Sequence, residues 1–94
     1  MGNTNHSVER EVVILNTKGL HARPVMKFVD LANKFSSSVS VSNHAESVDG
    51  KSPMEMMLLA ATRGSKLRIR AAGADAVEAV EALAGLVGRR FDEE

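Results

Sequence analysis

The sequence predicts an α+β domain in which helices cover one face of a sheet and leave the other face open. Two observations lead to this class. The elements follow one another as strand, helix, strand, strand, helix, strand, helix, and the strands alternate apolar with polar residues, so that each has a solvated side. A chain of 94 residues suits one domain. We expect it over residues 8–90, between a disordered segment, residues 1–7, and an acidic tail, residues 91–94.

The composition excludes several classes of protein. The 12 basic and 12 acidic side chains cancel, which argues against nucleic acid as the main partner, because the phosphate backbone binds net basic surfaces. The absence of cysteine excludes disulfides, thiolate zinc sites and thiol nucleophiles. No apolar run approaches the ~20 residues that span a bilayer, and the start does not read as a secretion signal. We therefore expect a cytoplasmic protein without membrane insertion, metal or cofactor.

The first elements are a strand and a helix. Residues 8–15 alternate at first and then run apolar, as a strand does, and residues 16–19 have turn chemistry. Residues 22–35 are predicted as a helix, and Pro24 fits within its first turn. The apolar positions of this helix fall on one face: Val25, Phe28, Val29, Ala32 and Phe35.

Two short strands and a short helix form the middle of the chain. Residues 39–42 alternate Val with Ser, and a polar hairpin over residues 43–46 leads to a second strand around residues 47–48. Ser52 is an N-cap, and the proline after it occupies the first helical position of a helix expected over residues 54–61.

A strand and a helix end the domain. Residues 66–71 alternate and point Leu67, Ile69 and Ala71 inward. Asp75 is predicted to cap the last helix, with Arg89 and Arg90 near its negative end. The predicted inward stripe of this helix is Val77, Val80, Leu83, Ala84 and Val87.

One of the three histidines stands out. His6 and His44 are expected to be solvated, whereas His21 lies where a turn enters a helix. The first N–H groups of a helix have no intrahelical partner and carry partial positive charge, so this end can hold an anion. A phosphoryl group on His21 would face these donors, and the Arg23 guanidinium could bind the same oxygens. The alternative is that His21 is a polar helix cap and Arg23 a solvated charge.

Other residues support a carrier more than a catalyst. No carboxylate pair, metal-spaced histidine set or glycine-rich nucleotide loop accompanies His21, so turnover of a small molecule is not expected. The methionines of residues 54–58 suit a surface that docks on several proteins, or they fill the core. Ser52 is a candidate phosphosite, or only an N-cap. The tail, residues 91–94, is expected to be solvated.

Two motifs resemble the HPr family, the histidine-phosphorylatable carriers of the bacterial phosphoenolpyruvate-dependent phosphotransferase system. The first is Gly-Leu-His-Ala-Arg-Pro at residues 19–24, and the second is Gly-Lys-Ser at residues 50–52, which leads into Met-Glu-Met-Met at residues 54–57. The similarity runs over about residues 8–87 and includes the order of the elements. The chain is therefore similar to this family in both motifs and in layout.

The resemblance implies a fold and an activity. The fold is an open-faced β-sandwich with a four-stranded antiparallel sheet and three helices on one face. His21 would accept a phosphoryl group on Nδ1 from phosphorylated Enzyme I and pass it to an Enzyme IIA-type acceptor, so the protein would be a phosphoryl carrier and not an enzyme. A monomer is the default expectation for a carrier that has to shuttle between partners. Arg23, with the backbone amides of Ala22 and Arg23, would bind the phosphoryl oxygens. Expected docking residues are Leu20, Pro24, Met54 and Met57.

Ser52 matches the regulatory serine of the family, which a dedicated HPr kinase/phosphorylase modifies in some members. Pro53 replaces the large aliphatic residue that commonly follows this serine, and Glu55 adds an acid to the docking helix. The ending Phe-Asp-Glu-Glu is similar to that of the nitrogen-related branch. Two other functions stay open: a regulatory binding module that acts through Ser52, and a small-ligand sensor, which would need a pocket.

Overall fold

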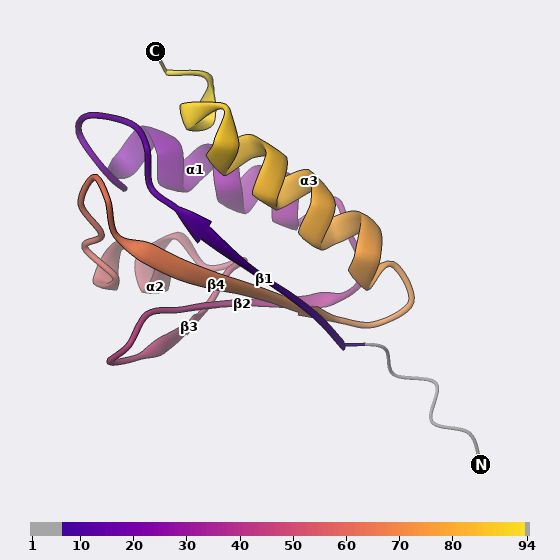
Figure 1. Cartoon of the computed structure of the whole chain (residues 1–94). Coiled ribbons are helices and arrows are strands. Elements are labelled where there is room, and N and C mark those ends of the chain that lie inside the picture. The colour runs from indigo at the N-terminus through magenta and orange to yellow at the C-terminus, as the bar shows by residue number, and fades with distance from the viewer. Residues whose placement is uncertain (1–6, 94) are drawn as a thin grey trace.

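Four antiparallel strands form one sheet in the order β1-β4-β2-β3 (Figure 1). The computed structural model describes residues 7–93. Helices α1 and α3 lie side by side across one face of the sheet, and α2 packs against α1 and β3. This arrangement confirms the predicted fold class. The elements are β1 (Ser7–Val13), α1 (Ala22–Ala32), β2 (Ser38–Ser42), β3 (Ser47–Asp49), α2 (Pro53–Leu58), β4 (Lys66–Ala72), α3 (Ala76–Gly88) and the 3-10 turn η1 (Arg90–Asp92).

One side of β2, β3 and β4 is buried, as the alternation predicts, whereas in the edge strand β1 the inward residues Val8 and Val12 are only half-buried. In β4 the inward residues Leu67, Ile69 and Ala71 are buried, and Ile69 stands opposite Val41 of β2. The other side carries charged residues, among them Glu9, which forms ion pairs with Arg68 and Arg70. Successive side chains of a strand point to opposite faces of the sheet. A shift of β4 by one residue would therefore expose its apolar side chains, so this pattern fixes the register of β4 between β1 and β2.

Helix α1 buries the stripe that the sequence predicts. Its buried residues are Pro24, Val25, Phe28, Val29 and Ala32. The helix ends at Ala32, three residues earlier than expected, and Asn33 is its C-cap. Phe35 nevertheless packs against the core from the turn that follows. The apolar spacing therefore locates the buried face of α1 correctly and places its end too late.

Helix α2 is also shorter than predicted. Ser52 is the N-cap, and Pro53 is the first helical residue, as expected. The helix ends at Leu58, and Ala60 has a left-handed backbone with φ of 47°. A non-glycine residue in this region ends a helix, because its backbone cannot continue the right-handed hydrogen-bond pattern.

The inward stripe of α3 differs from the prediction. Val77 is exposed, with 56% of its surface accessible, and Ala84 is only half-buried. The buried residues are Ala76, Ala79, Val80, Leu83, Leu86 and Val87. The spacing of three and four residues between these positions makes one continuous buried face, which includes Ala76 and Ala79 and leaves Val77 outside.

Asp75 does not cap α3 with its side chain, which corrects the predicted N-cap bond. Its carboxylate instead accepts hydrogen bonds from the loop before β2: from the Ser37 hydroxyl at 2.5 Å and from the backbone N–H groups of Ser36 and Ser37, each at 2.9 Å. The Ser37 hydroxyl is the largest of the causes that lower the pKa of Asp75 to about 2. Asp75 therefore joins the loop after α1 to the start of α3.

This interaction predicts a pH dependence of stability. The pKa of Asp75 is lower in the folded state than the ordinary value of about 3.9. Its contribution to stability is therefore complete above pH ~4 and is lost as the pH falls toward 2. We expect Asp75→Asn to flatten the pH dependence of the free energy of unfolding over this window, as urea unfolding at several pH values would measure. Asp30→Asn, on the exposed side of α1, is the control and should keep the wild-type slope. Equal slopes for wild type and Asp75→Asn would contradict the assignment.

The two ends of the chain also differ from the prediction. Ser7 is the first residue of β1 rather than part of a disordered segment, whereas residues 1–6 and 94, His6 among them, lie outside the described residues. The tail is not simply solvated: Phe91 is fully buried, and the Glu93 side chain is 11% exposed. Phe91 follows α3 closely enough to turn back into the core, so the packed part of the chain extends to residue 93.

Candidate functional site

A hydrogen bond joins the loop between β1 and α1 to the loop that precedes β4. The Leu20 N–H donates to the Ala61 carbonyl at 2.8 Å, and within the loop the Asn16 side-chain amide donates to the Gly19 carbonyl at 2.5 Å. Gly19 has φ of +71°, and a Cβ on it would lie 2.6 Å from the Ala61 oxygen. Only glycine fits this close approach without strain. These contacts fix where α1 begins.

His21 is the N-cap residue of α1. Its backbone is extended, with φ of −113° and ψ of −169°, and its carbonyl accepts the Val25 N–H at 2.9 Å. The side chain makes no capping hydrogen bond and is half-buried. The structure therefore does not support the alternative that the His21 ring serves as a helix cap. The N–H groups of Ala22 and Arg23, the first two helical residues, have no intrahelical partner.

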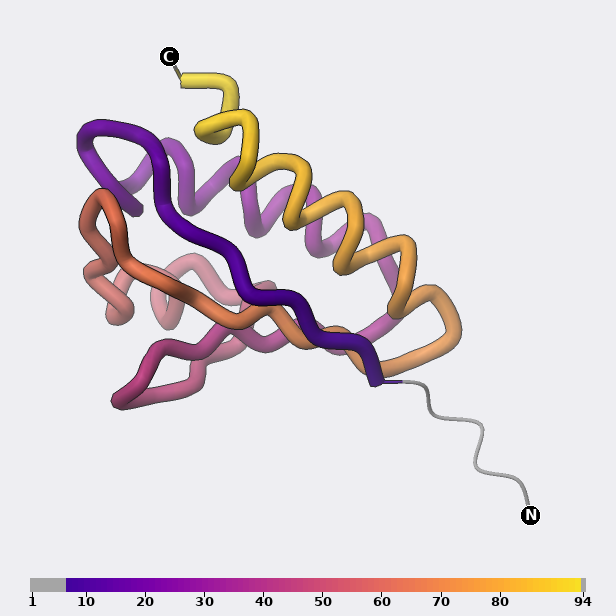
Figure 2. The backbone as a smooth tube through the Cα atoms, viewed as in Figure 1, coloured from indigo at the N-terminus to yellow at the C-terminus, as the bar shows by residue number. Residues whose placement is uncertain are grey.

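A surface hollow of about 250 Å³ lies beside His21. Its lining residues are Asn16, Thr17, Lys18, His21, Arg23 and Glu93. Figure 2 shows that the C-terminal turn (yellow) reaches the same end of the molecule as the loop before α1. The wall thus combines two cationic side chains with one carboxylate, at the end of a helix that carries partial positive charge. A small anionic group attached to His21 would find cationic donors in this hollow.

The carboxylate in the wall belongs to Glu93 and binds two cations of α1. One oxygen lies 3.2 Å from Arg23 Nη2, and the other lies 2.6 Å from Lys27 Nζ. The hydrogen bond from Lys27, with the positive charges of Arg23 and Lys27, lowers the pKa of Glu93 below its ordinary value. Sequence reasoning missed Glu93; the available signal was Phe91, an apolar residue that can anchor the tail.

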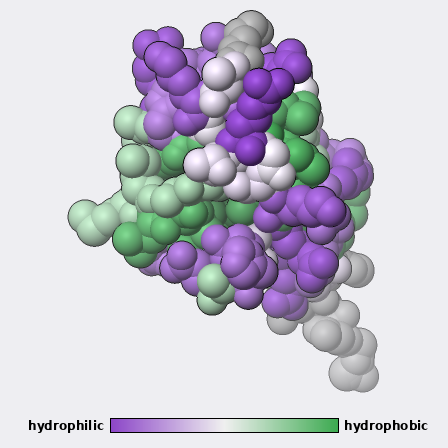
Figure 3. All heavy atoms as spheres, turned by 60° about the vertical axis from the view of Figure 1, so that its left-hand side comes forward, coloured by the Kyte–Doolittle hydropathy of each residue, from purple (hydrophilic) through white to green (hydrophobic). Residues whose placement is uncertain are grey.

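The predicted docking residues divide into buried and exposed pairs. Leu20 and Pro24 are buried, which corrects the expectation that they offer surface to a partner. Met54 is 80% exposed and Met57 is also exposed, whereas Met56 is in the core. Other exposed large apolar residues near this end are Leu15 before α1, Met26 on α1 and Leu58 on α2. In Figure 3, which turns this end forward, hydrophobic surface (green) lies beside hydrophilic surface (purple).

Ser52 acts as the N-cap of α2. Its hydroxyl accepts the Glu55 N–H at 3.2 Å, and the Glu55 carboxylate in turn accepts the Asp49 N–H at 3.0 Å. The side chain of Ser52 is half-buried at the start of the helix. The first bond satisfies a donor that the first turn of α2 would otherwise leave free, and the second joins this turn to the end of β3, so Ser52 is the N-cap in this structure.

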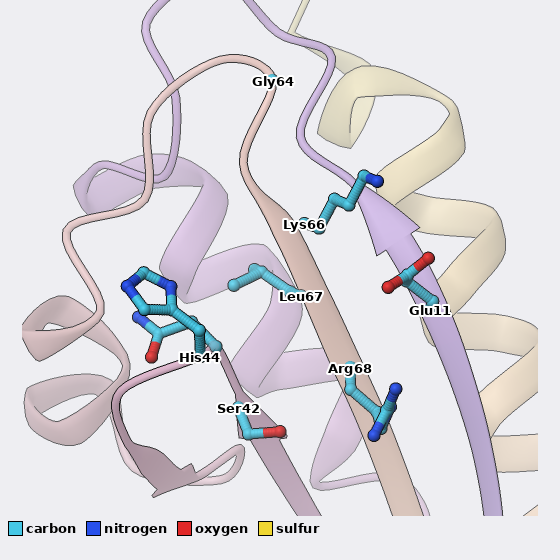
Figure 4. A pocket seen from close by; sticks show the side chains of 8 residues that line it. Glu11, Ser42, His44, Gly64, Lys66, Leu67 and Arg68 are labelled. Carbon is cyan, nitrogen blue, oxygen red and sulfur yellow. The ribbon is translucent and has the colours of Figure 1, made fainter.

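A second hollow, of about 540 Å³, lies on the open face of the sheet and does not include His21 (Figure 4). Glu11 of β1, His44 of the hairpin, and Lys66 and Arg68 of β4 surround it, with the helices behind the sheet. His44 is exposed, as predicted. The residues that line this hollow are mainly polar and charged, but none of them lies at the N-terminus of a helix, where His21 lies.

Neither a metal cluster nor a membrane span emerges from residues 7–93. In this range no three His, Cys, Asp or Glu side chains are placed to share a metal ion. Within the same range, every helix is too short or too polar to cross a bilayer.

Comparison with known proteins decides the family. The family described as PTS HPr component phosphorylation site matches residues 8–89. The chain belongs to the HPr family. The HPr-family match covers the His21 loop, α1, Ser52 and α2, and it ends before η1. The predicted phosphocarrier of the phosphotransferase system is therefore confirmed at the level of the family.

Similar proteins cover nearly the whole chain. Phosphocarrier protein HPr of Pseudomonas aeruginosa is 45% identical over 84 residues, 88% of this chain and 93% of that protein. Phosphocarrier protein NPr of Proteus mirabilis is 42% identical, over 90% of this chain and 96% of that protein. The crystal structure of HPr-C-His from Thermoanaerobacter tengcongensis superimposes with a TM-score of 0.88 at 40% identity, covering 93% and 98% of the two chains. HPr relatives thus share both the sequence and the architecture.

Proposed function

We propose that this HPr-family protein carries a phosphoryl group on His21, which it receives from phosphorylated Enzyme I and passes to an Enzyme IIA-type acceptor. The observation that carries the proposal is the position of His21. Its ring makes no capping bond at the N-terminus of α1 and faces a hollow that it shares with Arg23. The protein is then the substrate of a relay and performs no turnover of its own.

The transfer exchanges one N–P bond for another. The lone pair of His21 Nδ1 attacks the phosphorus of a phosphohistidine on the donor, and the N–P bond of the donor breaks with its electron pair returning to the donor ring. The hand-off to the acceptor histidine repeats this step with His21 as the leaving group. Exposed N–H groups of Ala22 and Arg23 and the Arg23 guanidinium are suited to bind the phosphoryl oxygens during both steps.

Arg23→Ala should leave the fold intact and weaken phosphoryl transfer. The Arg23 side chain is 79% exposed, so its removal leaves no cavity, but it takes away charge-assisted hydrogen bonds at the phosphoryl group. We expect the rate of transfer from Enzyme I to fall about 10- to 100-fold, in line with the energy of hydrogen bonds to charged groups. Rapid-quench measurement of phosphorylation would give this rate. Arg68→Ala, on the open face of the sheet, should transfer at the wild-type rate, and an unchanged rate for Arg23→Ala would reject the role of Arg23.

The partners need a docking surface beside His21. The exposed apolar residues of α2, Met54, Met57 and Leu58, together with Leu15 and Met26, provide adaptable contacts for Enzyme I and for the acceptor. A carrier that presents the same residue to two partners in turn has to dissociate from each of them, which favours a monomer. We place this exchange in the cytoplasm.

Ser52 offers a second level of regulation. A phosphate on its hydroxyl would replace the N-cap bond to Glu55 and would place negative charge near the carboxylates of Glu55 and Asp49. An HPr kinase/phosphorylase acting here would thus loosen the start of α2, which forms part of the proposed docking surface. Pro53 follows Ser52 directly and therefore affects whether a kinase can recognise this serine.

The test of the proposed function is phosphorylation with Enzyme I and phosphoenolpyruvate. We expect one phosphoryl group per chain, labile in acid, stable in alkali and located on His21 by peptide mapping under alkaline conditions. The product should lose the group when an Enzyme IIA is added. An acid-stable product on Ser52 or on another residue, or no product at all, would reject the carrier role of His21.

A further inference from the structure

The outward side chains of β4 form a row of cations on the open face of the sheet. Lys66, Arg68 and Arg70 occupy alternate positions of this strand, and all three are exposed. Side chains two residues apart on one face of a strand are about 7 Å apart. On the neighbouring strand β2, the residues opposite Arg68 and Arg70 are Ser42 and Ser40. The row of cations therefore has uncharged hydroxyl groups beside it on β2.

This row is only partly neutralised by carboxylates of β1. Glu9 lies 3.6 Å from Arg68 and 3.8 Å from Arg70, distances longer than a hydrogen bond. Arg70 has a second partner, because its Nε donates to the Ser7 hydroxyl at 2.7 Å. Lys66 is opposite an apolar residue of β1, and it forms no ion pair in the part of the chain that the structure describes. Positive charge without a counter-ion thus lies at the Lys66 end of the row.

The hollow on the open face of the sheet lies at this same end. Lys66 and Arg68 line it along β4, with Glu11 beside them on β1, and His44 lies across from β4 on the hairpin (Figure 4). Ser42 adds a hydroxyl group to the lining. The volume of about 540 Å³ falls within the range of small-molecule sites, about 300–1,000 Å³. The lining therefore combines two cations, a hydroxyl and an imidazole with one carboxylate.

The hairpin that carries His44 has a defined shape. The side-chain oxygen of Asn43 accepts hydrogen bonds from the N–H groups of Ala45 and Glu46, each at 2.8 Å. The Asn43 N–H in turn donates to the Glu46 carbonyl at 2.9 Å. An asparagine that binds the backbone two and three residues ahead stabilises a turn locally. The backbone of His44 is therefore held beside the hollow by the hairpin itself.

A phosphate monoester suits this lining better than other anions do. It carries nearly two negative charges at neutral pH and three acceptor oxygens, so Lys66, Arg68 and Ser42 can each donate to a different oxygen. A carboxylate offers one charge and two oxygens. An extended polyanion would also lie against the carboxylates of Glu9 and Glu11 on β1, which repel it.

Glu11 adds a second requirement to the ligand. Its carboxylate repels an anion but accepts hydrogen bonds from hydroxyl groups. A ligand whose phosphate lies at Lys66 and Arg68 gains from hydroxyl groups that reach Glu11. The lining therefore favours a phosphorylated polyol over inorganic phosphate.

We propose that the hollow on the open face of the sheet binds a small phosphate monoester that carries hydroxyl groups. Lys66, Arg68 and Ser42 bind the phosphate oxygens, His44 closes the site from the hairpin, and Glu11 accepts a hydroxyl of the ligand. This hollow shares no lining residue with the one beside His21. The site is thus separate from the proposed phosphoryl carrier function, and the ligand binds without any group being transferred.

The experiment titrates isotope-labelled, unphosphorylated protein with glycerol phosphate and follows the backbone N–H signals by NMR. We expect saturable shifts at Ser42, His44, Lys66 and Arg68. Inorganic phosphate should bind about two- to tenfold more weakly, the range of one net hydrogen bond, and glycerol should cause no shifts at these residues. Shifts that do not saturate, or that occur only at Ala22 and Arg23 at the start of α1, would overturn the proposal.

Lys66→Met and Lys34→Met form a matched pair of variants. Lys34 is exposed just after α1 and does not line the hollow. Lys66→Met should raise the dissociation constant of glycerol phosphate about two- to fivefold, the range of an exposed ion pair, whereas Lys34→Met should keep the wild-type value. Equal constants for the two variants would mean that the anion responds to overall charge and would reject the site.

Glu11→Gln tests which ligand the hollow prefers. Loss of the repelling carboxylate should strengthen the binding of inorganic phosphate and reduce the preference for glycerol phosphate. An unchanged preference would contradict the role of Glu11. A chain that accepts a phosphoryl group on His21 but shows no shifts on the open face keeps the carrier function and loses this site.

Discussion

Replacing His21 by alanine is expected to abolish phosphoryl uptake from Enzyme I. The ring supplies the nucleophile, and neither the free N–H groups at the start of α1 nor Arg23 can form an N–P bond in its place. The fold should persist, because the capping function of His21 resides in its carbonyl, which accepts the Val25 N–H in the variant as well. We expect the free energy of unfolding to change by less than about 0.5 kcal/mol. Mass spectrometry under alkaline conditions after incubation with Enzyme I and phosphoenolpyruvate measures the uptake.

His44→Ala is the matched control for this variant. His44 is exposed in the hairpin between β2 and β3 and lines the hollow on the open face of the sheet, apart from the site. It should accept the group as wild type does. Uptake that persists in His21→Ala, or that is lost in His44→Ala, would show that another residue carries the phosphoryl group.

The sequence predicts the sheet and the start of α1 well because these features depend on local patterns. Alternation over residues 66–71 identifies the buried face of β4, and the turn before His21 together with Pro24 identifies the N-terminus of α1. Asp75 shows the limit of such reasoning. An acid before a helix reads as an N-cap, but its carboxylate binds Ser36 and Ser37, which only the folded chain brings near it.

The tail shows the same limit at the site itself. Residues 91–94 read as a solvated acidic ending, because a single apolar residue among charged ones carries no periodicity. Phe91 enters the core only because α1 and α3 lie side by side and leave room for it, and this long-range packing then brings Glu93 to Arg23. A contact between residues 70 positions apart, such as that of Arg23 with Glu93, cannot be inferred from local patterns in one sequence.

Replacing Phe28 by alanine should cause the largest loss of stability. Phe28 is 2% exposed on the buried face of α1. Its ring approaches Gly50, where a Cβ would lie 3.3 Å from Phe28 Cε1 and 2.6 Å from the Val39 side chain, so this part of the core is tightly packed. Truncation of a buried Phe costs about 3–5 kcal/mol through lost burial and a residual cavity. A small domain has about 5–15 kcal/mol in total, so the variant should be partly unfolded at 37 °C.

Chemical denaturation of Phe28→Ala and Val77→Ala side by side tests this packing. Val77 lies on the stripe that the sequence predicts as buried in α3, but its side chain is 56% exposed in the structure. Truncating an exposed Val should change the free energy of unfolding by no more than about 0.5 kcal/mol. A large loss for Val77→Ala would mean that α3 presents the other face to the sheet, and a small loss for Phe28→Ala would mean that α1 does not bury its ring.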